Sequence, residues 1–213
     1  MTHPLQVYAD GLLLRTRARM RLQGGTVLPL PLDRYLGSAD ETDERLLDGI
    51  AGPVLDVGCG PGRHLHALAA RGIFGLGVDL SPVAVELARG RGARAVVGSI
   101  FDELPGSGSW RSALLLDGNI GIGGNPVRLL ERIGALLRMD GEVLVELGAP
   151  GTPTGSVMVR LETDNEVSSW FPWARVSTSD VDRVAGSAGF RVQRHRAVGA
   201  RWFACVVHRP ARP

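Results

Sequence analysis

The sequence contains no lysine, so all 24 of its basic residues are arginine. They are nearly balanced by 22 acidic residues, and the formal net charge of +2 excludes nucleic acid or an anionic membrane as a partner attracted by bulk charge. Only two cysteines are present, Cys59 and Cys205. They have no metal-ligand partners at useful spacing, which excludes a cysteine-based metal site and a disulfide framework.

Long apolar runs are also missing. No stretch approaches the ~20 apolar residues that cross a bilayer, and residues 1–10 lack the cationic and apolar regions of a signal peptide. We therefore expect a cytoplasmic protein with reduced cysteines. The many glycines, alanines and prolines, together with the absence of lysine, are typical of GC-rich bacterial coding. With 213 residues and 44% hydrophobic content, the chain suits one α/β domain with a sizeable core.

Residues 1–38 differ from the rest and are expected to form a lid or hairpin segment, ahead of a main domain over residues 39–213. Arginine occupies alternate positions from 15 to 21, and a Gln-Gly-Gly-Thr turn signal follows. This pattern predicts a hairpin whose return strand, residues 27–30, lies at a sheet edge because of its prolines. A helix over residues 10–22 is the alternative. The arginines are interpreted as the solvated face of an edge strand, and binding of a substrate phosphate or carboxylate is the alternative.

After a first helix that begins near Asp40, short apolar strands alternate with amphipathic helices. This order predicts a Rossmann-like, doubly wound α/β sheet that is mostly parallel and covered on both faces. The expected strands are residues 54–57, 74–78, 95–97, 113–116 and 142–147, and the expected helices between them are residues 64–70, 83–89 and 126–137.

The last third of the chain breaks this order. Residues 157–162, a turn at Asp164-Asn165 and the segment that follows predict an inserted hairpin after the fifth strand. A helix capped near Asp180 comes next, and strands at 190–197 and 202–208 close the chain. Their connection is short enough for an antiparallel hairpin. We therefore expect seven strands, with the last one antiparallel.

The most informative stretch is Val-Leu-Asp-Val-Gly-Cys-Gly-Pro-Gly-Arg-His at 54–64, which runs from a strand through a glycine turn into a helix. Ligands of open α/β sheets bind at such places. Three glycines, Gly58, Gly60 and Gly62, let backbone lie directly against a ligand. A dinucleotide fingerprint would place the third glycine one residue later, where this chain has arginine. The helix N-terminus offers amides to a carboxylate, and Asp56 can face an amine. A ligand with both groups is an amino acid, which describes the methionine end of S-adenosylmethionine.

Asp79 ends the second predicted strand about twenty residues after the first glycine, the spacing at which an acidic side chain reaches ribose hydroxyls. Its charge would repel a 2′-phosphate, which favours a plain adenosine ribose. The segment Gly98-Ser99-Ile100-Phe101 ends the third strand and is placed to border an adenine ring.

Together these motifs resemble those of the class I S-adenosylmethionine-dependent methyltransferases, over roughly residues 40–209. In that family the glycine motif contacts the methionine portion, the acid after the second strand holds the ribose, and the residues after the third strand flank the adenine. Many members have aspartate at the position of Ser99, and this chain departs from them there. The resemblance implies S-adenosylmethionine as cofactor, contacted by Asp56, Gly58, Cys59, Gly60, Gly62, Asp79, Leu80, Ser99, Ile100 and Asp117. Cys59 is interpreted as a small filler rather than a nucleophile, because nothing nearby would form its thiolate.

A glycine-rich loop, residues 117–126, follows the fourth strand, whose carboxyl end borders the transferring methyl group in this fold. We expect the loop to form the substrate floor, and the alternative is a plain connection to the next helix. Asp117 is the best-placed carboxylate for a general base, and Asn119 is a candidate to orient the acceptor. The Asn/Asp-Pro-Pro-aromatic pattern of adenine-N6 methyltransferases is absent, which disfavours a nucleic-acid base as substrate. We expect no metal ion in the site.

The few aromatic residues lie where several of them can contact an acceptor. Tyr8 and Tyr35 of the N-terminal segment can stack on it or hydrogen-bond to it. The segment Trp170–Trp173 is either an aromatic wall over the substrate or hairpin core, and Trp202 is expected in the core. His64 is expected to be solvated or beside the ligand rather than bound to a metal.

These features predict a methyltransferase that acts on an oxygen or nitrogen atom of a small molecule. Transfer would be in line, with alignment of the reactants and exclusion of water as the main contributions of the protein. One alternative is an enzyme that uses S-adenosylmethionine for different chemistry on the same scaffold. Another is a catalytically silent, cofactor-binding partner subunit, which the intact motif disfavours because such a protein is free to lose it.

Overall fold

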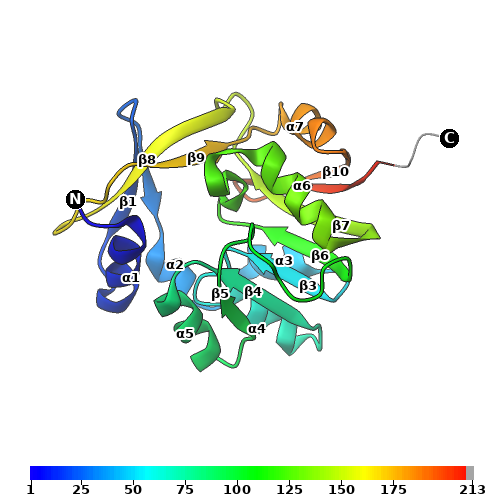
Figure 1. Ribbon diagram of the computed structural model, residues 1–213, viewed down its shortest axis with the longest axis horizontal. Helices are drawn as coiled ribbons and strands as arrows, with labels where there is room; N and C mark the ends of the chain where they lie inside the picture. The colour runs from blue at the N-terminus through cyan, green and yellow to red at the C-terminus, as the bar shows by residue number, and fades with distance from the viewer. Residues whose placement is uncertain (210–213) are drawn as a thin grey trace.

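The computed structural model describes residues 1–209 and contains two β-sheets (Figure 1). The larger sheet has seven strands in the order β10-β11-β7-β6-β3-β4-β5. Neighbouring strands from β7 to β5 are parallel, whereas β11 runs antiparallel to both β7 and β10. This confirms the predicted sheet with its antiparallel last strand. Its strands are β3 (Val54–Val57), β4 (Gly75–Asp79), β5 (Ala95–Val97), β6 (Trp110–Leu115), β7 (Leu137–Leu147), β10 (Phe190–Val198) and β11 (Arg201–His208).

Helices cover both faces of this sheet. Successive side chains of a strand point to opposite faces, so Leu55 and Val57 of β3 belong to one buried cluster and Val54 to another. Each fully buried residue of this kind contributes about 1.5–3 kcal/mol relative to exposure. The first face packs against α6 (Pro126–Leu136) and α7 (Val181–Ser187), and the second against α3 (Glu41–Leu47) and α4 (Arg63–Ala70), with α5 (Pro82–Gly90) beside α4.

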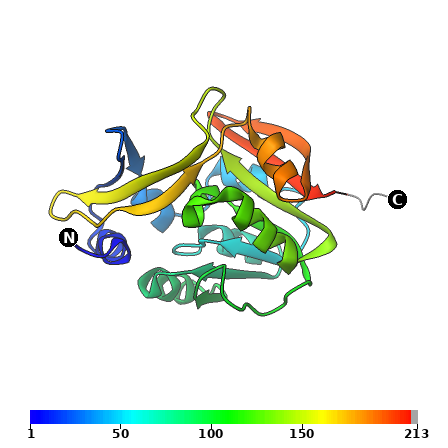
Figure 2. The ribbon, with the colours of Figure 1, turned by 45° about the horizontal axis from the view of Figure 1, so that its top comes forward.

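The smaller sheet has four antiparallel strands in the order β2-β1-β8-β9. They are β1 (Ala18–Leu22), β2 (Val27–Leu30), β8 (Gly155–Thr163) and β9 (Phe171–Arg175). Both predicted hairpins are confirmed, and β2 is an edge strand as predicted. The pairing of β1 with β8, which joins the two hairpins into one sheet, has no signal in the sequence. Figure 2 shows this sheet projecting to one side of the larger one, together with the first helix.

The chain ahead of β1 is helical. Helix α1 (Pro4–Leu14) ends where Arg15 takes a left-handed conformation, and α2 (Leu32–Leu36) leads from β2 towards the larger sheet. The alternative of one helix over residues 10–22 is therefore wrong after residue 15, because that stretch pairs within the smaller sheet. The lid role of residues 1–38 stays a prediction.

The interpretation of the alternating arginines as the solvated face of an edge strand is wrong. Strand β1 lies inside the smaller sheet and not at its edge. Arg19 and Arg21 reach the carboxylate of Glu162 on β8 at 3.1 and 2.6 Å, and Arg160 reaches it at 2.8 Å. The hydrogen bond from Arg21, followed by those of the other two arginines, lowers the pKa of Glu162 to about 2. A cross-strand carboxylate thus balances the repulsion among arginines that solvation alone was expected to relieve.

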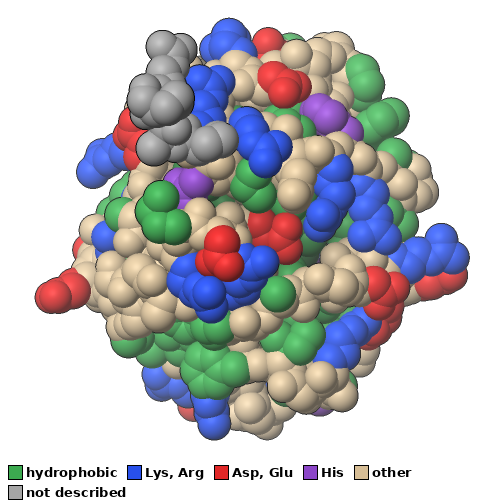
Figure 3. Space-filling view, turned by 90° about the vertical axis from the view of Figure 1, so that its right-hand side faces the viewer, with side chains coloured by type: hydrophobic (Ala, Val, Ile, Leu, Met, Phe, Trp, Pro, Cys, Tyr) green, Lys and Arg blue, Asp and Glu red, His purple; other side chains and the backbone are tan. Residues whose placement is uncertain are grey.

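Arginine and acidic side chains are interspersed with apolar ones on the face shown in Figure 3, in keeping with the small net charge. Both cysteines are buried and unpaired. Burial, together with a hydrogen bond to Glu142, raises the pKa of the Cys205 thiol to about 12. Within residues 1–209, none of the helices combines the length and the apolar character that crossing a bilayer requires.

Candidate active site

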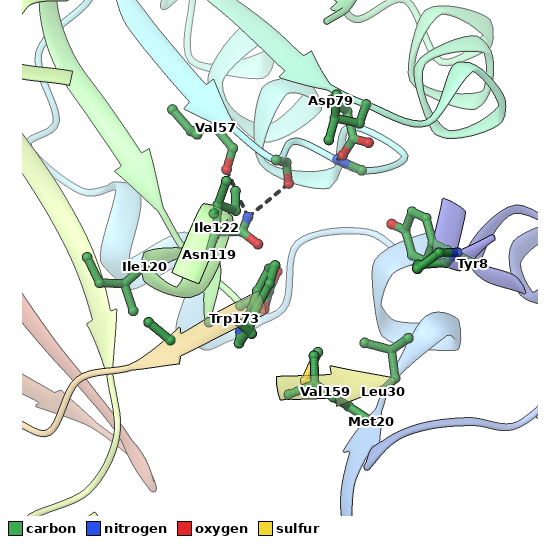
Figure 4. A pocket seen from close by; sticks show the side chains of 18 of the residues that line it. Tyr8, Met20, Leu30, Val57, Asp79, Asn119, Ile120, Ile122, Val159 and Trp173 are labelled. Carbon is green, nitrogen blue, oxygen red and sulfur yellow. Dashed lines mark hydrogen bonds between the residues drawn. The ribbon is translucent and has the colours of Figure 1, made fainter. Parts of the chain in front are cut away.

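A cavity of about 620 Å³ lies between the two sheets. One side is formed by the carboxyl ends of β3, β4, β6 and β7, where ligands bind in open α/β sheets. The other side is formed by α1 and the inner face of the smaller sheet. In Figure 4, Asp79 and Asn119 lie on the first side, and Met20, Leu30 and Val159 lie on the second.

Two polar side chains hold the glycine loop that follows β3. The backbone N–H of Gly60 donates to Asp79 Oδ2 at 2.9 Å. The side-chain amide of Asn119 donates to the carbonyl groups of Val57 and Gly58 at 2.8 and 2.9 Å (Figure 4). Gly58 has a φ of +70°, and a Cβ there would lie 2.7 Å from the Asn119 nitrogen. Glycine is therefore required, and the loop backbone faces the cavity without an intervening side chain.

Most of the predicted cofactor-binding residues line this cavity: Gly58, Cys59, Gly60, Asp79, Leu80, Ser99, Ile100 and Asp117. Asp79 Oδ1 also accepts a hydrogen bond from the backbone N–H of Ser81 at 2.8 Å, and burial raises the pKa of the Asp79 carboxyl group. Burial likewise raises the pKa of the Cys59 thiol well above its ordinary value. A thiol that stays protonated agrees with the interpretation of Cys59 as a filler.

Gly62 and Asp56 do not line the cavity. Gly62 precedes α4, where a Cβ would lie 2.8 Å from the Cβ of Ala88, so this glycine allows α4 and α5 to approach closely. Asp56 is 1% exposed, and its Oδ2 lies 3.8 Å from His64 Nδ1. Burial raises the pKa of Asp56 to about 6. The expectation that Asp56 faces the ligand's amine is corrected, because the pleat of β3 turns it to the face opposite Val57.

Asp117, the predicted general base, lies at the floor of the cavity with a left-handed φ of +53°. Its Oδ1 accepts hydrogen bonds from Arg34 at 2.9 Å and Arg201 at 3.3 Å. Its Oδ2 accepts from Arg63 at 2.5 Å. Its backbone N–H donates to Glu146 Oε2 at 2.6 Å. Both carboxylate oxygens are bound by guanidinium groups, so Asp117 would have to leave these ion pairs before it could accept a proton.

The same three arginines surround a second carboxylate, that of the fully buried Asp43. Arg34 and Arg63 each lie 2.8 Å from it, and Arg201 lies 3.0 Å from it. Burial alone would raise the pKa of Asp43, but His64, followed by Arg63, holds this pKa below its ordinary value. We call these side chains the floor cluster: Arg34, Asp43, Arg63, Asp117, Glu146 and Arg201.

Sequence reasoning finds only Asp117 of the floor cluster. The other five side chains come from α2, α3, α4, β7 and β11, so no local spacing connects them. Asp43 carries a signal as a helix-start acid, which its capping box with Asp40 confirms. Arg63 carries another, since it stands where a dinucleotide motif has glycine. Neither signal shows that these side chains meet.

The glycine-rich loop after β6 forms the short helix η1 (Asn119–Gly124) and lines the cavity. A Cβ on Gly121 would lie 2.2 Å from the indole nitrogen of Trp173. Phe171 and Trp173 line the cavity from β9. Trp170 lies instead under the guanidinium group of Arg160, at 4.9 Å. Two of the three residues of the predicted aromatic wall therefore face the cavity, and the glycines of the loop make room for one of them.

Tyr8 and Tyr35 of the N-terminal segment both line the cavity. Burial raises the pKa of both hydroxyl groups, so both stay protonated. His64 is only 4% exposed and also lines the cavity, with its Nε2 3.0 Å from Arg63. This burial speaks against the solvated role of His64, and its place beside the ligand stays a prediction. Trp202 is partly buried against the main core, as expected.

Residues 54–141 match a family model described as a methyltransferase domain. The crystal structure of an S-adenosylmethionine-dependent methyltransferase from Bacteroides fragilis, in complex with S-adenosyl-L-homocysteine, is similar over 97% of this chain and 95% of its own, with a TM-score of 0.78 and 21% identity. The 1,6-didemethyltoxoflavin-N1-methyltransferase from Burkholderia thailandensis is similar over 78% of this chain and 76% of its own, with a TM-score of 0.60 and 21% identity. The amino pentose methyltransferase CalS10 from Micromonospora echinaspora is similar over 83% of this chain and 94% of its own, with a TM-score of 0.59 and 18% identity.

These structural likenesses, all below 25% identity, show a shared fold. The likeness to the Bacteroides fragilis protein extends over nearly the whole chain. The match to the methyltransferase domain covers the part of the chain that forms β3 to β6, the helices between them and the beginning of β7. That part carries the glycine loop and Asp79. Residues 54–141 thus match a methyltransferase domain, and the fold of the chain is shared with S-adenosylmethionine-dependent methyltransferases of known structure.

Proposed function

We propose that the chain transfers the methyl group of S-adenosylmethionine to an oxygen or nitrogen atom of a small molecule. The observation that carries this proposal is the glycine loop after β3, which Asp79 and Asn119 hold open towards a cavity between two sheets. The N1-methyltransferase and the amino pentose methyltransferase of the same fold support a small-molecule acceptor. The proposed cofactor contacts are Gly58, Cys59, Gly60, Asp79, Leu80, Ser99 and Ile100.

S-adenosylmethionine, when bound, supplies a methyl group on a sulfonium that is already a good leaving group. The chain's own task is to align the acceptor and to exclude water. Asn119 acts in this proposal as a positioning residue for the glycine loop, and α1 with the smaller sheet covers the acceptor. Glu146 and Asp117 are bound to arginine, so we assign the floor cluster to holding the loop after β6 rather than to proton transfer.

The first prediction concerns cofactor choice. S-adenosylmethionine and S-adenosylhomocysteine are expected to bind in the micromolar range, and NAD and ATP far more weakly. The physical reason is the spacing of the glycines, which opens the loop to an amino acid and not to a pyrophosphate. Isothermal titration calorimetry with all four ligands measures this. NAD binding as tight as S-adenosylhomocysteine would contradict the cofactor assignment.

A second prediction tests the ribose contact. Asp79→Ala is expected to weaken binding of S-adenosylhomocysteine by about 1.5–3 kcal/mol, the worth of a hydrogen bond to a charged group. The loss includes the Asp79 bond to Gly60, which holds the loop. Calorimetry gives the affinity, and circular dichroism shows whether the domain stays folded. Asp164→Ala, in an exposed turn, is the control and should leave the affinity unchanged. An unchanged affinity in the Asp79 variant would place the ribose elsewhere.

S-adenosylmethionine that carries its label in the methyl group, incubated with the protein and a metabolite extract, separates the proposed activity from its alternatives. A labelled product supports methyl transfer. A new product without label would assign the chain to other chemistry on the same scaffold. Cofactor binding without any product would assign it to a silent partner subunit.

A further inference from the structure

The inner face of the smaller sheet gives the acceptor side of the cavity its chemistry. Strand side chains alternate between two faces, and the charged residues of β1 and β8 lie on the outer face, around Glu162. The residues that face the cavity from these four strands are almost all apolar. Figure 4 shows three of them, Met20, Leu30 and Val159, gathered opposite the glycine loop.

Arg175 is the charged residue that these four strands place in the cavity lining. It follows Phe171 and Trp173 at intervals of two along β9, so it shares their face of the sheet. Its cross-strand partner is Gly155, which puts no side chain beside it. Among the described residues 1–209, no carboxylate lies within ion-pair distance of the Arg175 guanidinium group, whereas Arg63, the other arginine of the lining, is paired with Asp43 and Asp117.

Among the described residues, the charge of Arg175 is therefore not neutralised by an ion pair, whereas the charges of the floor cluster neutralise one another. That cluster contains three arginines and three carboxylates that bind one another. A guanidinium group at the wall of a largely apolar cavity is stabilised by an anion that binds it, and its planar fork matches a carboxylate in two parallel hydrogen bonds.

The position of Arg175 points to the acceptor rather than to the cofactor. The residue after it, Val176, accepts a hydrogen bond from the N–H of Gly148, directly after β7. In the sheet order β7-β6-β3, the strand β7 lies two places from β3 and its glycine loop. Two strand spacings are about 10 Å. Arg175 thus lies on the side of the cavity away from the expected methionine and ribose sites.

We propose that the acceptor is an apolar small molecule that carries one carboxylate group. Its apolar body packs against the inner face of the smaller sheet, which includes Trp173, and Arg175 binds its carboxylate. This inference rests on the proposed function, because it names the acceptor class of the same site.

The test uses 2-naphthoate and its neutral analogue 2-naphthylmethanol as probes, titrated by calorimetry into protein saturated with S-adenosylhomocysteine. Wild-type protein is expected to bind the carboxylate at least tenfold more tightly than the alcohol. Arg175→Gln is expected to lose this preference and to bind the alcohol as the wild type does. Arg191→Gln, an exposed arginine on β10, is the matched control and should keep the preference.

Several results would overturn the proposal. Equal binding of the two probes by the wild type would contradict a carboxylate on the acceptor. Binding of neither probe would contradict an apolar acceptor. A tenfold loss of S-adenosylhomocysteine affinity in Arg175→Gln would assign Arg175 to the cofactor. A wild-type protein that does not bind S-adenosylhomocysteine would overturn the proposed function itself, and that failure is seen before any probe is added.

Discussion

Replacing Asp43 with asparagine is expected to lower the free energy of unfolding by about 3–5 kcal/mol, the usual effect of removing one partner from a buried ion pair. Asp43 is fully buried and binds Arg34, Arg63 and Arg201. Asparagine keeps the volume and an acceptor for the helix cap, so the change removes mainly the charge. Thermal melting should show a decrease of roughly 6–20 °C in Tm for a chain of this size.

The control for this prediction lies on the same helix. The side chain of Glu41 is 79% exposed and pairs with Arg45 one turn away. Exposed pairs of this kind contribute about 0.3–0.5 kcal/mol, so Glu41→Ala should melt close to the wild type. If Asp43→Asn melts at the same temperature as Glu41→Ala, the floor cluster does not stabilise the fold and does not hold the cavity floor in place.

The same carboxylate gives the wild type an acid-sensitive stability. The folded-state pKa of Asp43 is depressed, so its contribution is present above the unfolded pKa of about 3.9. The contribution is lost as the pH falls from that value towards the folded pKa. The difference in stability between wild type and Asp43→Asn should therefore be full near neutral pH and shrink below about pH 4.

The parallel sheet could be predicted because its signals are local. The strands β3, β4 and β6 are short apolar runs that are each followed by a helix. The glycine motif carries its own turn and close approach within a few residues. Helix α1, which the sequence did not predict, has no comparable local signal. Its cap is His3 and not one of the usual serine, threonine or aspartate residues, and the arginine alternation that follows dominates the pattern of the segment.

Two other features depend on contacts between distant parts of the chain. The smaller sheet forms when β1 pairs with β8, more than a hundred residues later, and each hairpin alone gives no sign of its partner. The floor cluster depends on five elements beside Asp117 and has no sequence period. Asp56 is a third example. The motif identifies a polar residue near the end of β3, but the pleat of the strand decides on which face of the sheet its side chain lies.

Deletion of residues 1–37, so that the chain starts at Ser38, is expected to abolish turnover while leaving the larger sheet folded. The deletion removes α1, β1, β2 and α2, and with them Tyr8, Tyr35 and the inner face of two strands from the cavity wall. Asp43 and Asp117 lose Arg34 but each keeps two other arginines, Arg63 and Arg201. Water then enters the site and the acceptor loses its wall, which should decrease transfer by about 100-fold or more.

Three measurements on this truncated protein decide between a lid and a structural flank. They are circular dichroism on heating, calorimetry with S-adenosylhomocysteine, and transfer of label from S-adenosylmethionine in a metabolite extract. A folded protein that keeps appreciable cofactor affinity but loses transfer supports the lid, since the glycine loop and Asp79 belong to the part that remains. A protein that melts at a lower temperature but transfers normally in its folded fraction would give residues 1–38 a stabilising role only. Full stability together with full transfer would exclude both roles, because neither the cavity wall nor the pairing of β1 with β8 would then matter to the enzyme.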